Sequence, residues 1–187
     1  MTINEHKTAA LRTETDYVAY RKNVSRSILA RNFMSMLRTM VCSANLADRW
    51  KRLMFYGKPP EKGERSLFCT DETAAPETIS KLQEENVRRL IHVAMGLYTE
   101  AGEVMEAVLA YITHGTRKPL DAINIAEEFG DAHWYLSLGA DVVRRNPEEI
   151  LEANIAKLRA RYPEAFNALN ATVRNLDRER AVLEGKC

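Results

Sequence analysis

Two pairs of acidic residues stand at helical spacing on either side of one turn signal, and this pattern constrains the fold most. Glu100 and Glu103 form the first pair, in YTEAGEVMEA. Glu128 and Asp131 form the second, in AEEFGDAHWY. The i, i+3 spacing puts both carboxylates of a pair on one helix face, where like charges repel. If the two pairs face each other, a divalent cation is needed between them, and hard oxygen ligands favour magnesium or manganese over zinc.

The segment between the pairs, HGTRKPLD, contains a glycine and a proline that break helices. If the turn is centred near residue 117, Glu103 and Asp131 each lie fourteen residues from it. In an antiparallel hairpin these two acids sit at the same height, with Glu106 level with Glu128. A shift of one helical turn would still leave the acids close together. The symmetry predicts a helical hairpin whose inner face carries the carboxylates.

Bulk composition indicates an ordinary globular chain. The 187 residues are 45% hydrophobic and 28% charged, with a net charge of +1. This balance argues against nucleic acid or a membrane surface as a partner, and no apolar run is long enough for a membrane span or a signal core. Cys42, Cys69 and Cys187 match no metal clip, so we expect reduced thiols and a cytoplasmic location.

Apolar periodicity and helix-capping residues predict an all-α fold. Asp121 is expected to cap the helix that carries the second acidic pair, and Asn146-Pro147 to begin the next one. We expect a polar, frayed segment over 1–14, a loop over 57–75, and helices over 16–56, 80–113, 121–145, 147–162 and 177–183. The predicted division is an N-terminal helical arm and loop over residues 1–79 and one domain over residues 80–187.

Three motifs of this domain together resemble the MazG-like nucleotide pyrophosphohydrolases, the all-α NTP pyrophosphatase superfamily. They are TEAGEVMEA, EEFGDAHWYL and NIAKLRARYPEAF, and the resemblance covers about residues 86–185. It rests on ExxE, then ExxD after a turn, then a helix with Asn, Lys and Arg followed by RYP. The ending NATVRNLDRERAVLEG is similar to tails of phage and bacterial members. The arm resembles no family.

The resemblance implies an antiparallel helical hairpin core that is completed by oligomerisation, as a dimer or tetramer. It also implies two or more Mg²⁺ ions, which Mn²⁺ can replace, holding a nucleoside triphosphate and activating water. The products would be a monophosphate and pyrophosphate. By motif match, the catalytic and metal-binding residues are Glu100, Glu103, Glu128 and Asp131. Lys157 and Arg161 would contact phosphate, and Asn154 would make a polar contact beside them.

Elementary electrostatics supports this chemistry. A triphosphate is a polyanion, and a pocket of four carboxylates would reject it without metal ions to bridge the two sets of charge. An acid that is not fully used as a ligand can accept a proton from the attacking water. The chain has no glycine-rich phosphate loop, which argues against a P-loop enzyme.

Three further residues share the acidic face of their helices. His92, two turns before Glu100, is either a packed histidine or a nucleobase or ribose contact. Tyr135 is either a core aromatic residue or a stacking surface for the base. Asn124, one turn before Glu128, is either an ordinary helix residue or a substrate contact.

We therefore expect a metal-dependent nucleoside triphosphate pyrophosphohydrolase that controls the deoxynucleotide pool. The nearest alternatives are a dUTP/dCTP-type pyrophosphatase and a phosphoribosyl-ATP pyrophosphatase of the same superfamily, and a preference for dGTP or another purine stays open. The alternative from a different class is a non-catalytic helical assembly module whose acids serve solubility.

Overall fold

The computed structural model describes residues 1–15, 17–58, 76–114 and 119–186, and these ranges form nine helices and no strand. The all-α prediction is confirmed for this part of the chain. None of its helices is long and apolar enough to cross a membrane. The helices are α1 (Ile3–Leu11), α2 (Val18–Val24), α3 (Ser27–Tyr56), α4 (Pro76–Gln83), α5 (Glu85–His114), α6 (Ala122–Val142), α7 (Pro147–Arg161), α8 (Ala168–Thr172) and α9 (Leu176–Leu183).

The chain forms two compact units. The hairpin unit comprises Ser27–Val142 and contains α3 to α6. The terminal unit comprises Met1–Arg26 together with Val143–Cys187 and contains the remaining helices. These contacts group the chain differently from the predicted division at residue 79, because α3, which we assigned to the arm, packs along α5.

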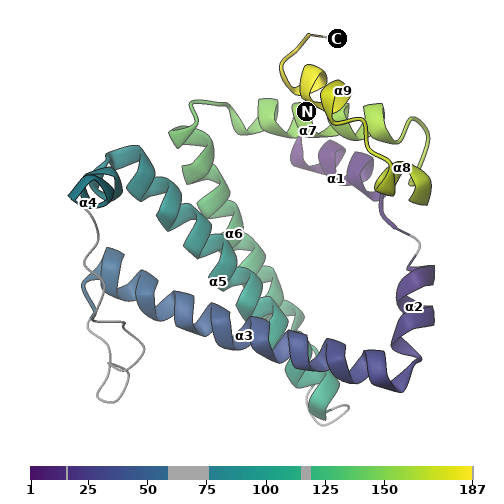
Figure 1. The fold of residues 1–187 in the computed structure, drawn as a ribbon, viewed down its shortest axis with the longest axis horizontal. Coiled ribbons are helices and arrows are strands. Elements are labelled where there is room, and N and C mark those ends of the chain that lie inside the picture. The colour runs from purple at the N-terminus through teal and green to yellow at the C-terminus, as the bar shows by residue number, and fades with distance from the viewer. Residues whose placement is uncertain (16, 59–75, 115–118, 187) are drawn as a thin grey trace. The chain divides into compact units, whose positions relative to one another are not determined.

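In the hairpin unit, α5 and α6 lie side by side and α3 lies against α5 (Figure 1). The pairing of α5 with α6 is antiparallel: Arg89 near the start of α5 binds Asp141 near the end of α6. Gly139 of α6 lies against Val93 of α5. Residues 115–118 of the predicted turn, like most of the predicted loop over 57–75, fall outside the described residues.

Helix ends follow the capping chemistry in two of the predicted places. Asp121 accepts hydrogen bonds from the backbone N–H groups of Ile123 and Asn124 at the start of α6. Asn146 accepts one from the N–H of Glu148 at the start of α7, at 2.9 Å. The predicted start at Ser80 is wrong, because Ser80 lies inside α4 and the break falls between α4 and α5, around Glu84.

In the terminal unit, α7 packs against α1 and α9. Our expectation of a frayed N-terminus is wrong for α1. Thr2 and Glu5 form a reciprocal capping box there, with the Thr2 side chain accepting from the Glu5 N–H and the Glu5 side chain accepting from the Thr2 N–H. Arg12 donates to the backbone carbonyls of Pro163, at 3.1 Å, and Glu164. A polar segment is thus ordered by its own cap and by α7.

Candidate metal centre

A glycine fixes how α5 and α6 are paired. Gly96 of α5 lies under the ring of Tyr135 of α6, and a Cβ atom at Gly96 would lie 2.2 Å from that ring. Tyr135 is buried with 6% of its surface exposed, so the ring has little room to move aside. One helical turn further towards the connection between the helices, the same pairing brings Glu100 of α5 to Asp131 of α6.

Three of the four predicted acids meet at this level. Glu100, Glu128 and Asp131 each bring one carboxylate oxygen within 4.8 Å of the others. Glu100 and Glu128 are buried, whereas Asp131 is exposed. The structure therefore confirms that the two acidic pairs face each other across the hairpin. We refer to these three residues as the acidic cluster.

The register of the hairpin differs from the predicted one by about one helical turn. We expected Glu103 opposite Asp131 and Glu106 opposite Glu128. In the structure Glu100 meets both Glu128 and Asp131, and Glu103 lies beside the cluster rather than within it. The pattern of acids alone could not fix the height, because the close contact between a glycine and a tyrosine one turn away determines it.

Glu128 carries the strongest electrostatic strain in the cluster. Burial, the charge of Glu103, and a hydrogen bond with Glu100 raise the pKa of Glu128 to about 7. Asn124, one turn earlier on α6, donates its Nδ2 hydrogen to Glu128 Oε1 at 3.0 Å and so orients the carboxylate. Burial and the neighbouring carboxylates thus both favour the protonated form of Glu128.

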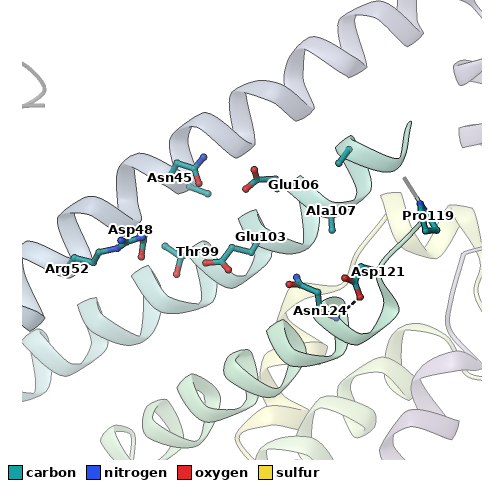
Figure 2. Close-up of a pocket in the computed structure, with 12 residues that line it drawn as sticks. Asn45, Asp48, Arg52, Thr99, Glu103, Glu106, Ala107, Pro119, Asp121 and Asn124 are labelled. Carbon is teal, nitrogen blue, oxygen red and sulfur yellow. Dashed lines mark hydrogen bonds and ion pairs between the residues drawn. The ribbon is translucent and has the colours of Figure 1, made fainter. Parts of the chain in front are cut away.

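Glu103 faces a cavity of about 460 Å³ that α3, α5 and the start of α6 line (Figure 2). Burial raises the pKa of the Glu103 carboxyl, and the charges of Glu100 and Asp48 raise it further. Oxygen-bearing side chains from all three helices line the cavity, together with one arginine, Arg52, which is paired with Asp48. These side chains are Asn45, Asp48, Thr99, Glu103, Glu106, Asp121 and Asn124.

The residues of α3 were missed by the sequence analysis. Lys51 is buried, with 6% of its surface exposed, and its ammonium group donates to Thr99 Oγ1 at 2.7 Å and to Glu100 Oε1 at 3.4 Å. It also forms an ion pair with Asp48 at 3.3 Å. The sequence shows DRWKR as one charged run on a helix, which is typical of a solvated face, so only the contact with α5 reveals Lys51 as part of the site.

His92 and Tyr135 belong to an aromatic cluster next to the acids. The His92 ring stacks on Phe55 with centroids 4.2 Å apart, and its Nε2 shares a hydrogen bond of 3.2 Å with the Tyr56 hydroxyl. Burial and then the charge of Lys51 lower the pKa of His92. Tyr135 and Trp134 contact the same imidazole edge-on. His92 is thus a packed histidine, and its predicted substrate contact stays a prediction.

The predicted phosphate contacts lie on α7, in the terminal unit. Asn154 and Lys157 are half-buried there. The Arg161 guanidinium is engaged with the buried Glu179 of α9 through two hydrogen bonds, one of them from Nε at 2.9 Å. Arg174 binds the same carboxylate, and Arg161 and Arg174 together lower the pKa of Glu179 to about 2. The ion-pair partner of Arg161 is therefore a residue that the local sequence does not reveal.

The donor chemistry of the acidic cluster fits a hard divalent cation. Its ligands are oxygen atoms only, two of the three carboxylates are buried, and the repulsion among them is only partly compensated. Comparison with known proteins gives no further guide: no family model matches the chain, and neither a curated protein nor a solved structure matches it.

Proposed function

We propose that the chain is a metal-dependent hydrolase of nucleoside triphosphates that releases pyrophosphate and a monophosphate. The observation that carries the proposal is the acidic cluster: three carboxylates from two helices within 4.8 Å, beside a cavity of about 460 Å³. Bound magnesium supplies Lewis-acid stabilisation of the charge that develops on the phosphates. The resemblance in sequence described above supports the choice of a triphosphate as substrate.

The four acids divide into two roles. Glu100, Glu128 and Asp131 hold the metal, with Asn124 orienting the Glu128 carboxylate. Glu103 stands outside the cluster and lines the cavity, so its carboxylate is available to accept a proton from the attacking water. Its raised pKa makes the carboxylate a stronger base than an ordinary glutamate.

The cavity suits the nucleoside part of the substrate. Its carboxylate groups repel phosphate, and its carboxylate and amide oxygens accept hydrogen bonds from sugar hydroxyl groups and from the amino groups of a base. Lys157 of α7 remains our candidate for phosphate contact. The exposed apolar side chains of Phe129 and Leu136, seven residues apart on one face of α6, support the expected dimer or tetramer, since such a face is stabilised by burial against another copy.

The test is hydrolysis of a panel of ribo- and deoxynucleoside triphosphates with magnesium, scored by the pyrophosphate released. We expect Glu103→Gln and Asp131→Asn each to lower kcat by at least about 100-fold with the helical circular dichroism signal retained. Glu85→Gln, which removes an exposed acid from the first turn of α5, is the matched control and keeps full activity. Full activity in EDTA would contradict the metal dependence, and no turnover of any triphosphate would contradict the hydrolase and favour a non-catalytic assembly module.

A further inference from the structure

Lys51 has an unusual position for a lysine. Its side chain is almost fully buried, and its ammonium group contacts three polar side chains of α3 and α5, namely Asp48, Thr99 and Glu100, with the Tyr135 ring of α6 at 5.6 Å. The three N–H bonds of the ammonium match these three partners in number. A buried charge is costly unless it is paired in this way. The ammonium group is therefore held by its protein partners rather than hydrated by bulk solvent.

The position of Lys51 matters because Glu100 belongs to the acidic cluster. Glu100 Oε1 accepts from Lys51 and also from Thr99 Oγ1, at 3.2 Å. The Glu100 carboxylate thus faces a fixed positive charge and, at the same time, two other carboxylates. When all three acids are ionised, the cluster and Lys51 together carry a net charge of two negative units, which one divalent cation balances.

We propose that Lys51 is the built-in counter-ion of the metal centre, a positioning residue that keeps Glu100 in place in the metal-free protein and weakens the binding of divalent ions to it. This inference rests on the proposed function, because it assigns Lys51 a role at the same metal site. It follows that, without substrate, the site binds divalent ions less tightly than three carboxylates with no cation beside them would, because Lys51 already neutralises part of their charge. It also makes α3, which resembles no family, a necessary part of the site.

The experiment measures Mn²⁺ affinity without nucleotide, by the electron paramagnetic resonance signal of free Mn²⁺, in the wild type and in Lys51→Gln. Glutamine removes the charge but retains an amide NH₂ group that can donate to Glu100 and Thr99, as the ammonium does. We expect Lys51→Gln to bind Mn²⁺ about ten-fold more tightly, because a repelling positive charge is gone. Arg89→Gln is the matched control: it removes the same charge from an ion pair between α5 and α6, several turns from the cluster, and leaves the affinity unchanged.

A second measurement protects the test against a variant that folds poorly. Thermal unfolding is followed in EDTA and in Mn²⁺ for the wild type, Lys51→Gln and Lys51→Met. We expect both neutral variants to melt at a lower temperature in EDTA and to gain more from Mn²⁺ than the wild type does, because the ion replaces the lost charge.

The outcomes separate the two proposals. Equal Mn²⁺ affinity and an equal gain in melting temperature for wild type and variants would overturn the role of Lys51 while leaving the metal centre intact. Binding of no Mn²⁺ by any of the proteins, wild type included, would overturn the proposed function itself.

Discussion

The Glu128 carboxyl, at the residue scale, ties metal binding to pH. Its pKa of about 7 in the folded protein lies above the ordinary glutamate value of 4.5. Between these two pH values the metal-free folded protein therefore holds a proton that the unfolded chain has lost. The free energy of unfolding of the metal-free protein therefore falls as the pH rises from 4.5 to about 7, because Glu128 loses that proton. A metal ion needs the carboxylate and must displace the proton.

We therefore expect Mn²⁺ affinity to rise steeply from pH 5.5 to about 7 and then to level off. Calorimetry in buffers of different ionisation enthalpy would measure the affinity and the proton that is released on binding. In Glu128→Gln the remaining affinity should be weak and nearly independent of pH over that range. An affinity that stays flat in the wild type would show that Glu128 is not a ligand.

Glu179 presents the opposite case, in the terminal unit. Its folded pKa of about 2 lies below the ordinary value, so the stability it contributes is fully present above about pH 4.5 and is lost as the pH falls towards 2. We expect Glu179→Gln to lower the free energy of unfolding at pH 7 by about 3 kcal/mol, because two arginines lose a buried partner. Chemical denaturation at pH 7 and at pH 3 would measure this effect, which should shrink at the lower pH.

Glu184 provides the matched control for this substitution. It also pairs with two cations, Arg180 and Lys186, but both of those side chains are largely exposed. Glu184→Gln should therefore lower the free energy of unfolding by clearly less than Glu179→Gln does. If Glu179→Gln and Glu184→Gln lowered the free energy of unfolding equally, burial of the Glu179 ion pairs would not add to stability.

At this scale the sequence predicted which carboxylates come together but not what surrounds them. The i, i+3 spacing of the acids was enough to place Glu100, Glu128 and Asp131 on facing helices. It could not reveal Lys51, because the partner of a buried lysine is set by packing between distant segments. It could not reveal Glu179 as the partner of Arg161 for the same reason.

At the scale of elements, α3 and α5 approach each other closely at one point. Gly102 of α5 faces Ala44 of α3, and a Cβ atom at Gly102 would lie 2.2 Å from the Ala44 Cβ. The two helices leave room for one methyl group at this point, and the Ala44 side chain of α3 fills it. The packing of α3 on α5, which carries Glu100, therefore depends on this pair of small residues.

We expect Gly102→Ala to lower the free energy of unfolding by about 2 kcal/mol, because the extra methyl group overpacks the contact. Adding Ala44→Gly moves the methyl group from one helix to the other and should recover at least about 1 kcal/mol of that loss, as a double-mutant cycle would measure. Gly130→Ala on α6 is the control: nothing lies within 4 Å of its Cβ position, so better helix propensity should stabilise it slightly. Strict additivity of the two substitutions at the contact would contradict this account.

Helix ends show where prediction from sequence succeeds and where it stops. Asp121 and Asn146 cap their helices as expected, because capping depends on a few neighbouring residues. The order of Ile3–Leu11 was not predicted, although Thr2 and Glu5 fit the capping-box pattern, because the segment is polar and its partner α7 is far along the chain.

For the molecule as a whole, the two compact units should respond differently to ligands. All residues of the acidic cluster, Lys51 and the cavity belong to the hairpin unit, whereas Lys157 belongs to the terminal unit. We expect Mn²⁺ alone to slow amide hydrogen exchange in α3, α5 and α6 and to leave α7 unchanged. Mn²⁺ with a non-hydrolysable deoxynucleoside triphosphate tests the proposed phosphate contact of Lys157, which predicts slower exchange in α7 as well.

Hydrogen exchange followed by mass spectrometry would measure both responses. Lys157→Ala should remove the second response and raise KM, with the first response kept. No change in α7 on adding nucleotide would remove Lys157 from the substrate site without affecting the metal centre.

The terminal unit is built from both ends of the sequence, and this has a consequence for the order of assembly during synthesis. Helix α1 leaves the ribosome first, yet its partner α7 emerges only after α3 to α6 have been completed. The hairpin unit, being continuous in sequence, can acquire its native contacts while the terminal unit still waits for its second half. In nascent chains stalled once residue 142 has left the ribosome, α3, α5 and α6 should therefore already resist protease, while α1 is still cleaved.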